Sequence, residues 1–62
     1  MNQLFAIINN EPVLVFEHDI YNACVGQAKF FYHSKGLHYP YMIIDKYGTK
    51  HCVNVTINIK HN

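Results

Sequence analysis

The chain has 62 residues, half of them hydrophobic, and a formal net charge of +1. A chain of this length forms one domain, placed at residues 1–62, and buries only about 60% of the surface that its unfolded form exposes. The small net charge and the lack of arginine argue against the strong basic field on which nucleic-acid binding depends. No apolar run has the length of a signal peptide or a membrane span, so we expect a cytoplasmic protein without membrane contact.

Two short apolar runs near the N-terminus predict a β-hairpin. Residues 4–8 and 13–16 are rich in β-branched and aromatic side chains. Asn9, Asn10, Glu11 and Pro12 separate the runs, and Asn and Pro are turn formers.

The next segment has the periodicity of an amphipathic helix. Asp19 is placed to cap its first turn, and Gly36 is placed to end it in the left-handed conformation. At about 100° per residue, one helical face collects the apolar side chains. The members of this face are Ile20, Tyr21, Cys24, Val25, Ala28, Phe31 and Tyr32. Phe30 does not fit the face and is expected to point outward.

The C-terminal half predicts a second hairpin. Residues 39–44 form an apolar run, and Pro40 near its start favours an edge strand or a strand beginning. Gly48 is expected in the turn that follows, and residues 51–60 then alternate between apolar and polar side chains. The order β-β-α-β-β predicts an α+β fold, with a four-stranded antiparallel sheet that carries one helix on one face.

The predicted strands carry more apolar surface than one helix can cover. Phe5 and Ile7 point away from Leu4 and Ala6, so the first strand is apolar on both faces. Exposed apolar patches of this kind usually mark an interface. We expect a homodimer or a protein partner to cover the second face, unless sheet curvature folds both faces into one core. With the first or third strand at a sheet edge, backbone pairing between copies is a second route to association.

Catalytic and metal-ligating patterns are weak in this sequence. His33 and His38 are five residues apart, and His51 and Cys52 are adjacent, whereas zinc ligands are typically paired two to four residues apart. Cys24 is expected to face the core, and no feature orients a histidine toward Cys52. We therefore expect no enzyme activity, no cofactor and no metal site, with both thiols free.

In length and layout the chain resembles small phage-encoded inhibitors, including anti-CRISPR proteins and host-takeover proteins. The matching parts are the hairpin at 4–16, the helix at 19–35 and the hairpin at 39–59. The resemblance is one of size and architecture without a sequence motif, so it carries over no functional residue. It implies a non-enzymatic protein-binding module that blocks a functional surface of a larger host protein. Many such inhibitors are acidic mimics of nucleic acid, whereas this chain is not acidic, which favours steric blocking.

Aromatic side chains dominate interfaces of this kind, which gives a set of expected contacts. The expected partner-binding residues are Phe30, Tyr39, Tyr41 and Tyr47, with Lys46 and Lys50 as charges at the rim. The alternative is a small nucleic-acid-binding protein, because the stretches 29–35 and 46–51 place lysines beside aromatic rings.

Overall fold

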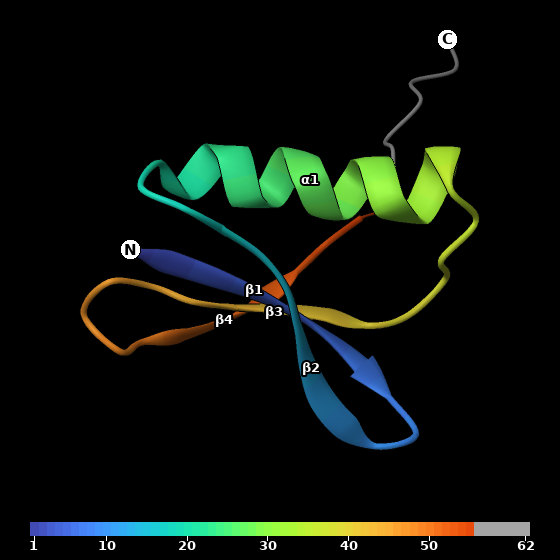
Figure 1. The fold of residues 1–62 in the computed structure, drawn as a ribbon, viewed down its shortest axis with the longest axis horizontal. Coiled ribbons are helices and arrows are strands. Elements are labelled where there is room, and N and C mark those ends of the chain that lie inside the picture. The colour runs from blue at the N-terminus through green and yellow to red at the C-terminus, as the bar shows by residue number, and fades with distance from the viewer. Residues whose placement is uncertain (56–62) are drawn as a thin grey trace, which may run out of the picture.

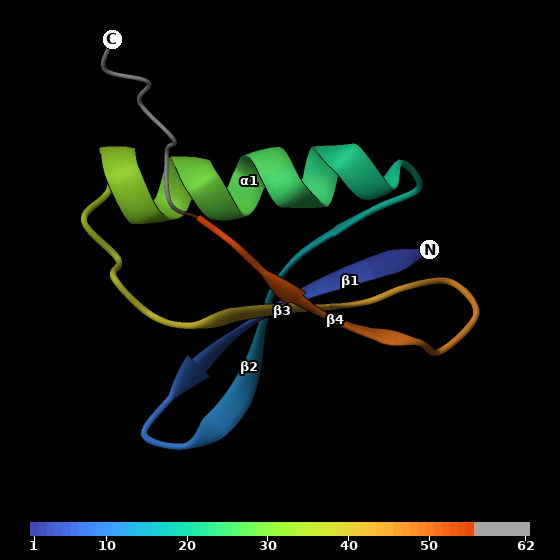
Figure 2. The same ribbon diagram turned by 180° about the vertical axis from the view of Figure 1, so that it is seen from behind.

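The computed structural model describes residues 1–55, which form one antiparallel sheet and one helix (Figure 1). The elements are β1 (Asn2–Ile8), β2 (Glu11–His18), α1 (Tyr21–Ser34), β3 (Tyr41–Ile44) and β4 (Lys50–Val53). The strands lie in the order β2-β1-β3-β4, and α1 packs against β1, β2 and β3. Figures 1 and 2 show α1 along one side of a strongly twisted sheet, with no described element along the other side. The predicted α+β fold is confirmed.

A two-residue turn joins β1 to β2. Asn9 and Asn10 both have positive φ, at 53° and 66°, which is the backbone of the tight turns that suit twisted hairpins. Asparagine tolerates this conformation better than most residues. Because the turn is so short, Glu11 and Pro12 belong to β2 and not to the turn predicted for them. Pro12 is accommodated there because β2 is an edge strand.

A β-bulge in β2 changes which side chains face the helix. Leu4 pairs with Phe16 and Phe5 pairs with Leu14, so Val15 is the extra residue. Simple alternation predicts Leu14 and Phe16 on the same face. The bulge instead turns Phe16 toward α1, where it packs with Val15 against the core, and leaves Leu14 on the opposite face.

The start of α1 differs from the prediction, and its end agrees with it. Ile20 occupies the N-cap position with an extended backbone and no side-chain cap, so the predictions of Asp19 as cap and Ile20 as a buried residue are wrong. The cause is a contact with β1: the Asn2 amide donates to the Asp19 carbonyl at 2.9 Å, and His18 Nδ1 accepts from the Ile20 amide at 3.0 Å. Gly36 ends the helix with φ of 68°, as predicted.

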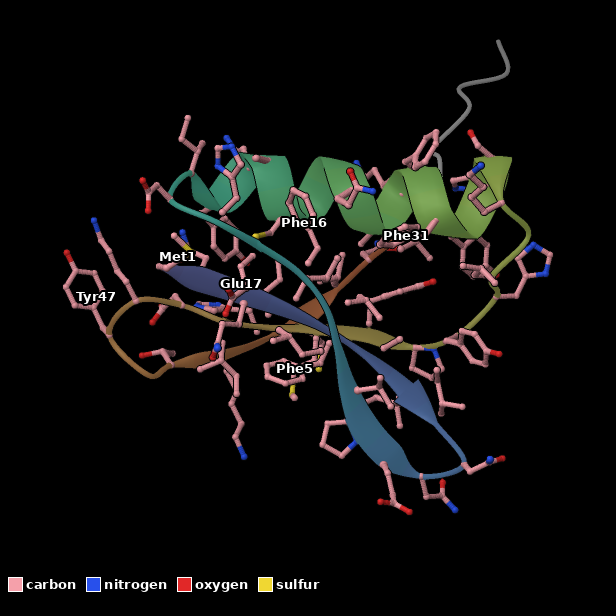
Figure 3. All side chains as sticks on the ribbon, viewed as in Figure 1. Met1, Phe5, Phe16, Glu17, Phe31 and Tyr47 are labelled. Atoms are coloured by element: carbon pink, nitrogen blue, oxygen red, sulfur yellow. The ribbon has the colours of Figure 1, made fainter. Side chains whose placement is uncertain are left out.

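The core lies between α1 and the two central strands. Its buried hydrophobic members are Leu4, Ala6, Cys24, Ala28, Tyr41 and Ile43. Cys24 and Ala28 are fully buried, which confirms the predicted helix face. Figure 3 shows Phe16 and Phe31 on the helix side of the sheet and Phe5 on the opposite side.

The second hairpin is shorter than the sequence predicts. β3 begins at Tyr41, directly after Pro40, which confirms the strand-beginning alternative for that proline. β4 ends at Val53, and residues 56–60 of the predicted last strand lie outside the described residues. β1 and β3 are central, so the expectation that one of them forms a sheet edge is wrong. The edges are β2 and β4.

Candidate protein-binding surface

The side of the sheet that α1 leaves uncovered is apolar. In the strand register Phe5 lies beside Leu14 and Met42, and Met42 lies beside Cys52. We call this surface the open face, and its apolar members are Phe5, Ile7, Leu14, Met42, Ile44 and Cys52. The prediction that β1 is apolar on both faces is confirmed, and β3 is also apolar on both faces.

Within residues 1–55 the side chains of the open face lie under no covering element and have one another as neighbours. Leu14 is 46% exposed and Cys52 is exposed, whereas Phe5 and Met42 are half-buried. Among residues 1–55 no element packs on this side of the sheet (Figure 2). The half-burial of Phe5 and Met42 therefore comes from neighbours within the twisted sheet, and the patch as a whole stays accessible to a partner.

Two charged residues mark the margins of the open face. Glu17 on β2, Gln3 on β1, Ile44 on β3 and Lys50 on β4 form one row across the sheet. The Gln3 side-chain amide donates to the Glu17 carboxylate at 3.0 Å and holds it over the sheet. The open face thus has an acidic margin at β2 and a basic margin at β4.

The predicted aromatic anchors do not gather in one place. Tyr47 is 82% exposed in the β3–β4 turn, and Lys46 lies over its ring at 5.4 Å from the centroid (Figure 3). Phe30 is 45% exposed in the second half of α1, with Lys35 over its ring at 5.7 Å. The β3–β4 turn lies near the first turn of α1, so these two lysine–aromatic pairs belong to different ends of the helix.

The two other predicted tyrosines lie at the core. Tyr41 is 4% exposed, and its hydroxyl donates to the Leu37 carbonyl at 2.6 Å. Burial, reinforced by the nearby Tyr39, raises the pKa of Tyr41. Tyr39 is half-buried beside an apolar hollow of about 380 Å³. Tyr41 therefore has no surface to offer a partner and lies outside the proposed interface.

A hollow of about 470 Å³, lined by residues with polar side-chain groups, lies between the β3–β4 turn and the start of α1. His51 Nε2 lies 2.8 Å from Asp45 Oδ2, and the Tyr47 and Thr49 amides each donate to Asp45 Oδ1 at 2.9 Å. The His51 hydrogen bond, followed by those amides, lowers the pKa of Asp45. The His51 ring packs edge-on against Tyr21 at 5.2 Å. The Asp45–His51 pair, with the two amides on Asp45, fixes the turn that presents Tyr47 and Lys50.

Each side of the sheet has its own cysteine. Cys24 is buried under α1, donates to the Asn2 carbonyl at 3.7 Å, and has a pKa raised by burial, so its thiol is held protonated. Cys52 is exposed on the open face. Within residues 1–55 no three His, Cys, Asp or Glu side chains are grouped closely enough to hold a metal ion. No helix in this part of the chain has the length and apolarity to span a membrane.

Comparisons with protein-family models, with curated proteins and with solved structures found no match for this chain. Apolar residues at every position of β1 from Leu4 to Ile8 indicate the open face from the sequence alone. Leu14, Met42 and Cys52 were not among the expected anchors, because their common face depends on strand order and on the bulge at Val15.

Proposed function

We propose that this chain is a non-enzymatic protein-binding module and that the open face is its binding surface. The observation that supports this function is a sheet with apolar side chains on both faces and one helix that covers one of them. Covering apolar surface contributes about 25 cal/mol per Å². A partner that packs on Phe5, Leu14 and Met42 gains this term, and a 62-residue chain has little other means of stabilising that side.

Three of the six residues that were expected from the sequence to bind a partner lie together beside the β4 margin of the open face. Lys50 begins β4 at the margin of the open face, and the turn with Lys46 and Tyr47 leads directly into it. A partner that covers the open face and extends past β4 meets these three residues. Tyr47, with 82% of its surface exposed, is then the aromatic contact of the rim.

Steric inhibition is the form of this function that the resemblance to phage-encoded inhibitors implies. In that form the chain occupies a functional surface of a larger host protein in the host cytoplasm. Its small size and its sheet suit such a role, because a surface that is formed before binding loses little conformational entropy when a partner binds.

Binding of single-stranded nucleic acid is a second candidate. The Lys46–Tyr47 and Lys35–Phe30 pairs favour it, since bases stack on aromatic rings beside cations. These pairs lie at different ends of α1, and nucleic-acid binding gives no role to the apolar open face. A gel shift with a single-stranded oligonucleotide at two salt concentrations tests this candidate, because phosphate contacts weaken steeply with salt.

Two adjacent residues of β2 provide the test of the proposed function. Leu14 and Val13 are similarly exposed, at 46% and 42%, but they point to opposite faces of the sheet. We expect Leu14→Glu to abolish capture of protein partners by the tagged chain and Val13→Glu to leave it intact. Equal capture by the wild type and Leu14→Glu would place the binding surface elsewhere.

A further inference from the structure

We propose that a second copy of this chain covers the open face, in a two-fold dimer of face-to-face sheets in which Glu17 pairs with the partner's Lys50. This inference rests on the proposed role of the open face in protein binding and names the occupant of that face in the free protein, which a larger partner would displace. It is carried by the positions of charged and apolar residues in the strand register.

The open face is ordered in rows that cross the strands from β2 to β4. One row reads Glu17, Gln3, Ile44, Lys50, and the next reads Leu14, Phe5, Met42, Cys52. In the first row opposite charges occupy the two ends and uncharged residues fill the middle. The second row is apolar along its whole length.

A two-fold axis parallel to the strands, between β1 and β3, superimposes these rows on themselves. It places β2 over the partner's β4 and β1 over the partner's β3. Glu17 then meets the partner's Lys50, and the symmetry repeats this contact at the other margin. In the apolar row Leu14 meets the partner's Cys52 and Phe5 meets the partner's Met42. Sheets that pack face to face keep their strands roughly aligned, as this axis requires.

A two-fold arrangement about an axis perpendicular to the strands matches the surface less well. An axis perpendicular to the strands, through the apolar row, places β2 over the partner's β2. Glu17 then lies opposite the partner's Pro12, and Cys52 lies opposite the partner's Cys52. Neither Glu17 nor Lys50 gains an opposite charge, so charge complementarity selects the axis between β1 and β3.

Both margin charges are free to pair between copies. Within residues 1–55 the one ion pair is Asp45–His51, so neither Glu17 nor Lys50 has an ionic partner in its own chain there. Gln3 holds Glu17 toward the sheet and reduces the side-chain entropy that pairing would cost.

The sheet edges favour this packing over edge-to-edge pairing. β2 has Pro12, which lacks a backbone donor, and a bulge at Val15. β4 has only four residues, and Lys50 is its first. Neither edge offers a long regular row of backbone groups, whereas the open face offers an apolar surface.

The size of the open face indicates a weak dimer. With about 4.8 Å between strands and about 6.8 Å between rows, two rows across four strands and a third row across β1 and β2 give about 330 Å² of face per copy. Stable interfaces bury about 800 Å² per partner. We therefore expect a dissociation constant in the micromolar range.

Charge-swapped variants test the proposed pairing by native mass spectrometry. Glu17→Lys alone and Lys50→Glu alone each bring like charges together twice, and we expect each to raise the dissociation constant about tenfold. The double variant E17K/K50E restores both pairs and is expected to dimerise like the wild type. An equimolar mixture of the two single variants is expected to form mainly mixed dimers, because every pair is then of opposite charge.

Two control variants carry the same charge changes at positions away from the open face. Glu11→Lys and Lys29→Glu make the same charge changes at exposed positions away from the open face, and we expect neither to change the dissociation constant. Circular dichroism melting shows whether each variant is folded. Single swaps that behave like these controls, or a double variant as weak as the singles, would overturn the inference. A monomeric wild type at every micromolar concentration would also overturn it, whereas loss of partner capture in Leu14→Glu would still support the proposed function.

Discussion

The two faces of the sheet have similar composition and opposite surroundings. Leu4 and Ile43, which face α1, are fully buried, whereas Leu14 on the open face is 46% exposed. Both faces follow from the same alternation of side chains along the strands. The difference arises because the chain supplies one helix, which covers one face. Apolar side chains on a strand therefore show that this face of the sheet is suited to packing against another apolar surface. The number of covering elements shows whether the chain itself supplies that surface.

Truncation of one leucine on each face is expected to give the largest difference in stability. Leu4→Ala removes a fully buried side chain and leaves a cavity, so we expect a loss of about 2–5 kcal/mol in the free energy of unfolding. Leu14→Ala in dilute solution is expected to cost less than about 1 kcal/mol, because Leu14 has no cover in the monomer. Urea denaturation of both variants provides the comparison. Equal losses would mean that the two faces are equally buried in solution.

The reactivity of the two cysteines measures the difference in burial between the face under α1 and the open face. Cys52 is exposed, whereas Cys24 is buried with a raised pKa. We expect an aromatic disulfide reagent to modify Cys52 at once and Cys24 at least about a hundredfold more slowly, because Cys24 reacts only when the domain opens. Higher protein concentration should slow the modification of Cys52 alone, since the dimer covers the open face. A rate of Cys52 modification that does not depend on protein concentration would contradict a dimer that covers the open face.

Acid is expected to weaken the turn that presents Lys50 at the margin of the open face. The pKa of Asp45 is lowered, first by the His51 hydrogen bond and then by the Thr49 amide. A carboxyl whose folded pKa lies below its unfolded value of about 3.9 stabilises the fold above that pH. This contribution is lost as the pH falls through the folded value. The melting temperature of the wild type should therefore fall when the pH is lowered below about 4. Asp45→Ala should have a lower melting temperature at neutral pH, and that temperature should depend less on acid.

A residue outside both faces provides the smallest expected effect. Phe30 points outward from α1 and is 45% exposed. Phe30→Ala is expected to change the free energy of unfolding by less than about 1 kcal/mol and to leave dimerisation unchanged. The same melting and mass measurements apply. Loss of association in this variant would move the interface to the outer surface of α1.

The sequence predicted the elements well because their signals are local. The apolar run at residues 39–44 and the helical spacing of Cys24 and Ala28 depend only on neighbours along the chain, and the structure confirms a strand in the first and a buried helix face in the second. The start of α1 was misplaced because Asn2, far away in sequence, holds the backbone at Asp19. Such a contact has no sequence signal of its own.

The sequence predicts that an uncovered apolar surface exists, but it does not predict which residues form its centre and its margins. Apolar residues on both sides of β1 indicated an uncovered face, and Phe5 and Leu14 lie on it. The strand order, which places Glu17 and Lys50 at opposite margins, depends on how the two hairpins pair. The bulge at Val15 also moves Phe16 to the helix side. Both are tertiary features, so spacing along the chain does not reveal them.

Sedimentation equilibrium of the wild type and Leu14→Glu tests most directly whether a second copy covers the open face. The account predicts that the mass of the wild type rises from that of the 7.3 kDa chain toward twice that value across micromolar concentrations. Leu14→Glu is predicted to stay monomeric and folded over the same range, because a charge is then placed in the apolar row. A wild type that stays monomeric, with a melting transition independent of concentration, would contradict the account and would mean that the twisted sheet needs no cover on its second face.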